Sequence, residues 1–315
     1  MERLIAIIGP TAVGKTQVSI ELAKMLNSEI ISGDSMLVYQ ELNIGTAKPS
    51  SDEQSNIAHH LMDILEPQEE FSVVEFTEMA SKKITAINAK GKIPILAGGT
   101  GLYVKALLEG YQFNPTPNDD KLRTKLDELA KEYGNQYLHD KLAEVSPDTA
   151  ARLHPNDLRR IIRALEIFYL SGDTVSQNKI TDQHNLLYDT VVIGLTMERK
   201  LLYERINQRV DSMIAQGLVS EVARLLECGI PVNCQAMQGI GYKEIIKYLQ
   251  NDMELTTAID NIKQATRNFA KRQLTWYRKM PYISWLDVND FVTHNDLMET
   301  IYKKVAGKLN LKSNN

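Results

Sequence analysis

A glycine-rich loop near the N-terminus constrains the fold of this chain more than any other stretch. Leu4 to Ile8 is a short apolar run, rich in β-branched residues, and it predicts a buried strand. Apolar residues recur at helical spacing from Gln17 to Leu26, which predicts a helix. The loop between them matches the pattern glycine, four residues, glycine, lysine and threonine, and consists of Gly9, Pro10, Thr11, Ala12, Val13, Gly14, Lys15 and Thr16. A strand, this loop and a helix in that order predict a phosphate-binding loop.

The chemistry of the loop predicts a site for a polyphosphate, which need not belong to a nucleotide. Gly9 and Gly14 let the backbone curl, so that successive N–H groups point into one concavity at the positive end of the following helix. Lys15 supplies a mobile positive charge, and Thr11 is a further donor inside the loop. The hydroxyl of Thr16 is the candidate protein ligand for Mg²⁺.

Expected strands and helices alternate after this loop. The further strands are expected at 29–32, 59–64, 93–97 and 189–195, and a helix at 73–88. An alternation that begins with a phosphate loop predicts an α/β fold, with a P-loop NTPase-like parallel sheet flanked by helices. Ligands of such sheets lie beyond the carboxyl ends of the strands. Asp34 and Thr100 each follow an expected strand, so we expect both to face the loop.

The pattern changes after Asn114, where prolines interrupt the chain and only helical segments follow. These helices are expected at 121–132, 135–145, 147–152 and 157–170. We therefore expect residues 115–188 to form an all-helical insertion domain. Residues 1–114 and 189–315 are expected to form the core that carries the phosphate loop, mainly helical from residue 200 onward.

Asp34 is the first candidate for chemistry beside the loop. A carboxylate there could hold Mg²⁺ through water or accept a proton from a substrate, and capping of the next helix explains the residue equally well. ATPases usually place an acidic residue at the end of an apolar strand, but 93–97 ends in Gly98-Gly99-Thr100-Gly101, and only Asp63 is available as a substitute. This departure favours group transfer over hydrolysis.

Three groups of basic residues are candidates for binding a polyanion, although the formal net charge of the chain is −4. They are Arg159, Arg160 and Arg163; Arg199, Arg205 and Arg209; and Lys263, Arg267, Lys271, Arg272, Arg278 and Lys279. A solvated helix face explains any one group about as well. The third group is the strongest, because Trp276 and Tyr277 lie among its cations and aromatic rings stack on bases. It favours a single-stranded nucleic acid as partner.

The cysteine content and the hydropathy pattern indicate in which cellular compartment the protein is expected. Cys228 and Cys234 are the only cysteines, too few for a disulfide framework and without the companions of a zinc site. No apolar run approaches membrane-spanning length, and Met1 leads directly into an expected strand without room for a signal peptide. We therefore expect a cytoplasmic protein that does not associate with a membrane.

From the residues alone, a P-loop transferase is the leading interpretation. A small-molecule kinase shares the loop and the sheet, and it would bind and consume ATP with Mg²⁺. A nucleotide-gated RNA-binding module is the non-enzymatic alternative, and it would bind RNA without changing it covalently.

An ordered set of motifs narrows these alternatives. Besides the loop, they are Gly33-Asp-Ser-Met36 with Val38-Tyr39, Asn43-Ile-Gly-Thr-Ala-Lys48, His59-His-Leu61, Ala97-Gly-Gly-Thr-Gly-Leu-Tyr103, His154-Pro-Asn-Asp157, Arg163-Ala-Leu-Glu166, Gly239-Ile-Gly-Tyr242 and Lys271-Arg-Gln-Leu-Thr-Trp276. In this set and order the chain resembles the bacterial tRNA dimethylallyltransferases, the IPP transferase family, from end to end. The resemblance also accounts for the missing acid, because the loop of that family grips the diphosphate of dimethylallyl diphosphate instead of ATP.

The resemblance implies transfer of a dimethylallyl group to N6 of the adenosine on the 3′ side of the anticodon, after that base flips into a channel. Three expected catalytic residues follow from it. Asp34 would be the general base for the N6 amine, and Thr100 would hydrogen-bond the RNA near the target. Residues 9–16 with Mg²⁺ and Arg209 would bind the departing diphosphate and stabilise its charge.

The resemblance also implies a set of tRNA contacts. They are Asp34, Ser35, Met36, Leu37, Thr100, Arg123, Arg159, Arg160, Ile161, Ile162, Arg163, Lys271, Arg272, Trp276 and Arg278. The helical insertion would correspond to the mobile domain that closes on the anticodon stem-loop in that family. The similar adenylate isopentenyltransferases act on free nucleotides and lack both this insertion and the basic C-terminal segment, so they fit less well. We expect the protein to be a monomer.

Overall fold

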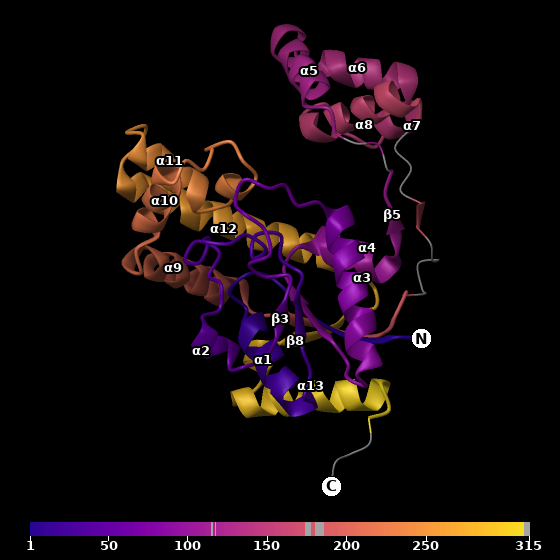
Figure 1. Ribbon diagram of the computed structural model, residues 1–315, viewed down its shortest axis with the longest axis vertical. Helices are drawn as coiled ribbons and strands as arrows, with labels where there is room; N and C mark the ends of the chain where they lie inside the picture. Colours follow the sequence, from indigo (N-terminus) through magenta and orange to yellow (C-terminus); the bar gives the residue numbers. More distant parts are fainter. Residues whose placement is uncertain (115, 117, 174–177, 180–185, 312–315) are drawn as a thin grey trace. The chain divides into compact units, whose positions relative to one another are not determined.

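The computed structural model describes residues 1–114, 116, 118–173, 178–179 and 186–311 (Figure 1). The chain divides into two compact units. One consists of Met1–Gly110 together with Thr181–Asn315, and we call it the sheet unit. The other, Tyr111–Ile180, is called the helical unit. The insertion expected at 115–188 overlaps the helical unit, which begins and ends a few residues earlier.

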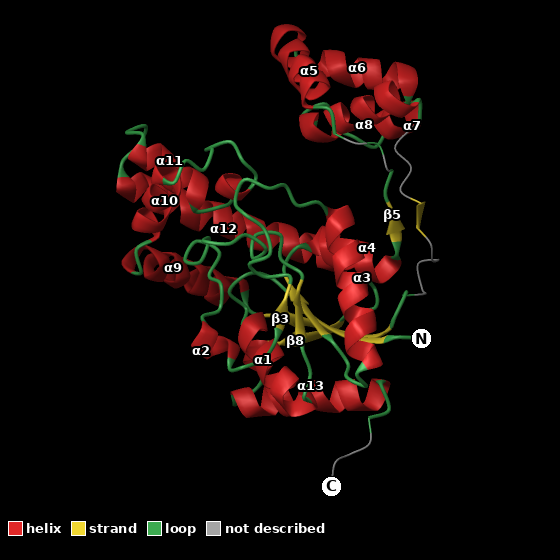
Figure 2. Cartoon of the chain, in the orientation of Figure 1, coloured by secondary structure: helices red, strands yellow, loops and turns green. Residues whose placement is uncertain are grey.

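A parallel sheet forms the centre of the sheet unit and has six strands in the described part of the chain (Figure 2). The strands are β1 (Arg3–Ile8), β2 (Ile30–Ser32), β3 (His59–His60), β4 (Ile95–Gly98), β7 (Asp189–Thr196) and β8 (Ser284–Asp287). Their order is β3-β2-β4-β1-β7-β8, so that β1 lies between β4 and β7. The predicted α/β fold with a parallel sheet is confirmed.

Helices cover the sheet and also make up most of the helical unit. Those of the sheet unit are α1 (Lys15–Leu26), α2 (Ser51–Gln54), α3 (Val73–Ala89), α4 (Gly101–Glu109), α9 (Arg199–Ala215), α10 (Leu218–Glu227), α11 (Tyr242–Leu249), α12 (Leu255–Tyr277) and α13 (His294–Lys308), with short 3₁₀ helices η1 (Ala236–Gln238) and η2 (Val288–Asp290). Those of the helical unit are α5 (Asp120–Tyr133), α6 (Asn135–Val145), α7 (Pro147–Ala150) and α8 (Leu158–Ser171), beside the antiparallel pair β5 (Tyr111–Gln112) and β6 (Asn178–Lys179). Within the described residues, no helix has both the length and the apolar character that a membrane span requires.

The central strand β1 contributes to the core on both faces of the sheet. Every side chain from Leu4 to Ile8 is fully buried, as expected for a parallel strand that helices cover on both sides. Because successive side chains point to opposite faces, Leu4, Ala6 and Ile8 pack in one apolar cluster with residues of α3 and α4. Ile5 and Ile7 pack in a second cluster with residues of α1 and α13. The loop that follows β1 therefore leaves from the middle of a rigid sheet.

The strand expected at 59–64 is shorter than predicted. Only His59 and His60 belong to β3, because Leu61 and Asp63 have φ angles of 60° and 51°, which no strand accommodates. Asp63 forms an ion pair with Lys48. The carboxylate considered as a substitute for the missing acid is thus engaged by a lysine.

Glu29 carries a pH-sensitive ion-pair cluster just before β2. Its side chain is 10% exposed, and its carboxylate lies 2.8 Å from His60 Nε2 and 2.9 Å from Lys90 Nζ. Burial by itself would raise the pKa of Glu29, but the hydrogen bonds from His60 and Lys90 outweigh it and lower the pKa from 4.5 to about 2. The folded protein therefore holds this carboxylate charged more strongly than the unfolded chain does.

We expect the stability that Glu29 provides to be complete above about pH 4.5 and to be lost as the pH falls toward 2. Glu29→Gln should lower the free energy of unfolding at neutral pH by up to about 3 kcal/mol and flatten its dependence on pH in this window. Urea unfolding followed by circular dichroism between about pH 7 and pH 3 measures both. Glu299→Gln is the matched control, because it breaks an ion pair whose side chains are 64% and 71% exposed. A Glu29→Gln profile parallel to that of the wild type contradicts the assignment.

Candidate functional site

The phosphate loop follows β1 and turns sharply into α1. Gly9 has a φ of 149°, and a Cβ there would lie 2.5 Å from the carbonyl oxygen of Leu195 in β7, which leaves no room for a side chain. Gly14 has a φ of 105°, a conformation that favours glycine, immediately before Lys15 opens α1. Gly14 and Thr16 are exposed, so the positive N-terminal end of α1 is open to a ligand. This backbone fits a phosphate group at the carboxyl edge of the sheet.

The segments that follow β2 and β4 lie against each other beside this loop. A Cβ on Gly98 would lie 2.4 Å from the carbonyl oxygen of Gly33, so the two backbones approach closely. The Thr100 N–H donates to the Gly33 carbonyl at 3.2 Å, and the Thr100 hydroxyl oxygen accepts from the Ser35 N–H at 3.1 Å. Asp34 lies between Gly33 and Ser35, so Thr100 and Asp34 meet at one edge of the sheet.

The side chain of Asp34 does not cap a helix. Its Oδ1 accepts from the N–H of Met36 at 2.8 Å, which closes a tight turn. All of residues 34–50 are described, and no helix begins among them. The capping alternative is wrong, because the chain after Asp34 continues in turns and bends up to α2.

Two cations and the Asp34 carboxylate share the space around the phosphate loop. The Lys15 ammonium donates to the Pro10 carbonyl at 2.8 Å, and Arg209 on α9 donates to the Thr46 carbonyl at 3.4 Å. Burial and the positive charge of Arg209 lower the pKa of Lys15 to about 8, against the opposing effect of Asp34. Burial also lowers the pKa of Arg209, again opposed by Asp34. Two partly buried cations whose charges affect one another favour a multiply charged anion, which relieves their mutual repulsion.

A residue that the sequence interpretation missed ties α12 to this site. Gln273 is 4% exposed; its Oε1 accepts from the Thr11 N–H at 2.8 Å, and its Nε2 donates to the Gly99 carbonyl at 2.9 Å. The Tyr277 hydroxyl, one turn later on α12, donates to the Gly98 carbonyl at 3.4 Å. Gln273 thus connects the phosphate loop with the loop after β4. The available signal was an uncharged amide four residues before a tyrosine, within a run of cations.

The opposite face of α12 presents the predicted basic patch to solvent. Lys271, Arg272 and Arg278 are exposed, and Trp276 is half-buried. Trp276 packs closely on Gly101, because a Cβ added to that glycine would lie 3.0 Å from the Trp276 Cβ. A cavity of about 370 Å³ is lined by Asn268, Lys271, Arg272, Thr275 and Trp276. The patch therefore combines exposed cations with a half-buried indole ring that lines the same cavity.

Two other cations of the same helix bind protein groups instead. Lys263 lies 2.6 Å from the Asp211 carboxylate, and Arg267 donates to the Asn207 side chain at 2.6 Å. Both contacts connect α12 with α9. These two residues hold the helices together, so the basic patch is confined to the C-terminal half of α12.

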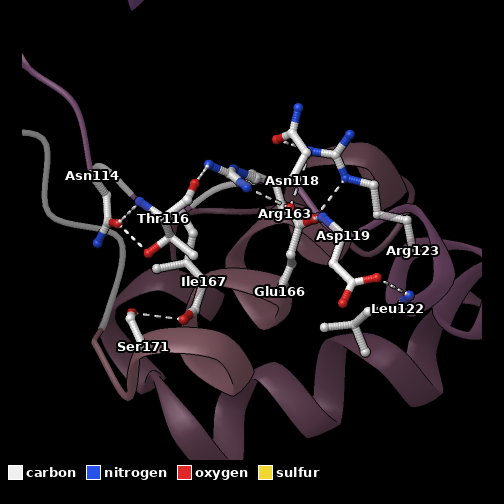
Figure 3. Close-up of polar contacts among 10 residues, drawn as sticks. All are labelled: Asn114, Thr116, Asn118, Asp119, Leu122, Arg123, Arg163, Glu166, Ile167 and Ser171. Atoms are coloured by element: carbon white, nitrogen blue, oxygen red, sulfur yellow. Dashed lines mark hydrogen bonds and ion pairs between the residues drawn. The ribbon is translucent and has the colours of Figure 1, made fainter.

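In the helical unit, two predicted tRNA-contacting arginines converge on a buried carboxylate (Figure 3). The side chain of Glu166 is 0% exposed; Arg123 Nε lies 2.9 Å from it and Arg163 Nη1 2.6 Å. It also accepts from the Asp119 N–H at 2.7 Å, and Arg163 donates to the Thr116 carbonyl at 2.8 Å. These hydrogen bonds outweigh burial and lower the pKa of Glu166. Glu166 therefore holds both guanidinium groups and the start of α5 in place.

Two residues of α8 that were predicted to contact tRNA, Ile161 and Ile162, have buried side chains, so the prediction is wrong for these side chains. Ile161 is 0% exposed and Ile162 is 6% exposed, and both pack in the apolar core of the helical unit with Leu126 and Leu142. An amphipathic helix must bury its apolar face, so these side chains cannot also face an RNA. Arg159 and Arg160 are exposed on the same helix, although Arg160 forms an ion pair with Asp157.

The candidate residues thus fall into two sets that belong to different units. The sheet unit brings together the phosphate loop, the segment from Asp34 to Leu37, Thr100, Arg209 and the outer face of α12. Met36 lies against Gly239, where a Cβ would be 2.6 Å from the Met36 Cε atom. The helical unit carries Arg123 and the arginines of α8.

The parallel sheet and the groups around the loop are those of a P-loop α/β protein in which a carboxylate and two cations meet at the phosphate loop. A family model described as IPP transferase matches residues 37–280 of this sequence. The chain belongs to the IPP transferase family.

Relatives and solved structures match almost the whole chain. The tRNA dimethylallyltransferase of Geobacillus thermodenitrificans is 49% identical over 313 residues, 99% of each chain. That of Bacillus mycoides is 48% identical over 314 residues, covering 100% of this chain and 98% of its own. The crystal structure of the tRNA isopentenylpyrophosphate transferase from Bacillus halodurans superposes with a TM-score of 0.75 at 46% identity, covering 99% and 98%. A eukaryotic dimethylallyltransferase acting on tRNA matches with a TM-score of 0.79 at 30% identity, covering 98% and 80%.

Proposed function

We propose that this protein is a tRNA prenyltransferase that moves the dimethylallyl group of dimethylallyl diphosphate to N6 of the adenosine on the 3′ side of the anticodon. Its membership of the IPP transferase family supports transfer to tRNA. The observation that carries the chemistry is that Lys15, held by the Pro10 carbonyl, and Arg209, held by the Thr46 carbonyl, lie within electrostatic reach of Asp34 beside the phosphate loop. Two cations suit a departing diphosphate, and a carboxylate suits an amine that must lose a proton.

Each of these residues has one part in the proposed reaction. The bond between N6 and the allylic carbon forms while the bond from that carbon to the diphosphate oxygen breaks. Asp34 accepts the proton that the exocyclic amine loses, because that amine is a poor nucleophile until its proton has an acceptor. Lys15 and Arg209 stabilise the negative charge that grows on the diphosphate, and the N–H groups of the loop orient it. The Thr100 hydroxyl, whose oxygen accepts from the Ser35 N–H beside Asp34, would hydrogen-bond the RNA.

Mg²⁺ fits this site as an ion that arrives with the diphosphate. Thr16 offers an exposed hydroxyl oxygen, a hard ligand, at the start of α1. The described residues contain no group of three His, Cys, Asp or Glu side chains that could hold a metal. Thr16 would therefore supply one ligand, with diphosphate oxygens and water as the others, in keeping with the preferences of Mg²⁺. The bound ion would neutralise part of the diphosphate charge.

We propose tRNA contacts on each unit separately: the outer face of α12 in the sheet unit, and the exposed arginines of α8 in the helical unit. Lys271, Arg272 and Arg278 neutralise phosphates, and Trp276 offers a stacking surface for a base. Ser35, Met36 and Leu37 would line the access of the target base to Asp34, as the resemblance implies. We propose that the protein acts as a monomer in the cytoplasm, and light scattering with and without tRNA tests the first part.

Mass spectrometry distinguishes this proposal from the kinase and RNA-binding alternatives. Incubation with Mg²⁺, dimethylallyl diphosphate and an anticodon stem-loop should add one five-carbon unit to the RNA. ATP in place of the prenyl donor should add nothing. An RNA of unchanged mass in the first reaction contradicts the proposal, and phosphorylation in the second supports a kinase.

The double variant Lys271→Gln/Arg272→Gln should weaken tRNA binding and make it less dependent on salt. For each phosphate that the variant no longer neutralises, the slope of log affinity against log salt should decrease by about 0.7 in a single-stranded region. Filter binding of an anticodon stem-loop at several salt concentrations measures the slope. Lys303→Gln/Lys304→Gln removes two exposed cations from α13 and is the control that should leave the slope unchanged. An unchanged slope in the α12 variant places the RNA surface elsewhere.

A further inference from the structure

Glu221 on α10 is a buried carboxylate outside the phosphate site, and its environment is unusual. It is 6% exposed, and its carboxylate accepts hydrogen bonds from four donors in other parts of the sheet unit. Its Oε2 accepts from the N–H groups of Asn43 at 3.1 Å and Ile44 at 2.8 Å. Its Oε1 accepts from the Gly45 N–H at 3.1 Å and the Tyr242 hydroxyl at 2.6 Å.

Three consecutive N–H groups that converge on one anion form a backbone nest. In this protein the anion is the side chain of Glu221, so the nest holds the loop 43–45 against α10. Hydrogen bonds to a charged acceptor are stronger than neutral ones, and burial excludes competing water. The ring of Tyr242 completes the fit, because a Cβ on Gly45 would lie 2.5 Å from it. The position of the loop is therefore set by Glu221.

The next residue of this loop touches the phosphate site. The carbonyl of Thr46 accepts from Nη2 of Arg209 at 3.4 Å. Arg209 in turn lies close to Lys15 and Asp34. Its positive charge lowers the pKa of Lys15, and the Asp34 carboxylate opposes the lowering of the pKa of Arg209. A continuous set of contacts thus runs from Glu221 through the loop to the guanidinium group. The carboxylate itself lies outside the set of groups proposed to touch the substrates.

We propose that Glu221 is a positioning residue that acts through the loop 43–46 to orient Arg209 toward the diphosphate. The inference rests on the proposed function, in which Arg209 binds that diphosphate. Removing the carboxylate frees the loop and with it the carbonyl that orients the guanidinium group. A guanidinium that must be ordered again on binding holds its anion less tightly.

Binding of inorganic pyrophosphate, measured by calorimetry at constant Mg²⁺, tests the proposal without turnover. Glu221→Gln should weaken pyrophosphate binding by roughly tenfold, the effect of one misaligned charge-assisted contact. Arg209→Met should weaken it at least as much. The double variant should bind no worse than Arg209→Met alone, because Glu221 acts through Arg209. Arg224→Gln, which breaks the exposed ion pair between α10 and Glu41, is the matched control and should bind as the wild type does.

A second variant keeps the test informative if Glu221→Gln does not fold. Tyr242→Phe removes one donor to Glu221 and leaves the three N–H groups, so it should weaken pyrophosphate binding severalfold. Added to Arg209→Met, the same substitution should cause no further loss. Additive losses in the double variants, or wild-type binding by both the Glu221 and the Tyr242 variants, overturn the positioning role. Wild-type binding by Arg209→Met instead refutes the proposed contact between Arg209 and the diphosphate, so this failure is distinguishable from a failure of the positioning role.

Discussion

Asp34→Asn is expected to lower the rate of prenyl transfer by about 10²–10⁴-fold, the usual contribution of a general base. The amide keeps an oxygen that can accept from the Met36 N–H, so the turn after β2 should persist. It cannot take the proton from the adenine amine. The affinity for tRNA should therefore change little, because the substitution removes the proton acceptor and no cation. Single-turnover kinetics with a labelled stem-loop, paired with filter binding, separates the two effects.

Asp63→Asn is the matched control for this experiment. Asp63 also follows a strand, β3, but its carboxylate is bound by Lys48 and is 47% exposed. Its substitution should leave the transfer rate close to that of the wild type. If Asp34→Asn retains a sizeable fraction of turnover, the proton acceptor is a different group.

Lys15→Met is expected to reduce kcat/KM for dimethylallyl diphosphate by about 10²–10³-fold, as for other preorganised donors to a developing anion. Methionine preserves much of the volume of the side chain but carries no charge. The neighbouring Arg209 would remain, so the variant isolates the contribution of one cation. Steady-state kinetics over a range of donor concentrations measures the loss.

The pKa of Lys15 adds a pH dependence to this prediction. Burial and the charge of Arg209 lower the pKa of Lys15 to about 8, so the ammonium is present at neutral pH and is lost as the pH rises through that value. Pyrophosphate binding by the wild type should therefore weaken above about pH 8, and this part of the pH profile should be absent in Lys15→Met. Lys24→Met, on the exposed side of α1, should retain the wild-type profile. A profile shared by the wild type and Lys15→Met contradicts the assignment.

The binding partners of charged side chains are the part of the site that the sequence could not predict. The sequence grouped the cations of α8 and those of α12 by their position along the chain. It could not indicate that Arg123 on α5 binds the buried Glu166 on α8, or that Lys263 and Arg267 on α12 bind groups on α9. Helical periodicity depends on neighbours within one turn, whereas the partner of a long side chain depends on which helix packs beside it.

Local patterns in the sequence were enough to predict the strand β1, the phosphate loop, the helix after it and the parallel sheet. These features depend on local alternation, helical spacing and the conformational freedom of Gly9 and Gly14, which neighbouring residues largely decide. The order of the motifs also predicted the family that the comparisons show. Each of these properties is readable without knowing which distant segments meet.

Which groups surround the phosphate loop depends on tertiary packing. Gln273 contacts Thr11 of the phosphate loop across 262 positions of the chain. Glu221 binds a different loop, 43–46, through the N–H of Asn43, which is 178 positions away in the chain. Tertiary packing also buries Ile161, and the Asp34 carboxylate closes a turn instead of capping a helix. The physical reason is that buried polar groups must find partners, and packing of whole helices on the sheet determines which partners are within reach.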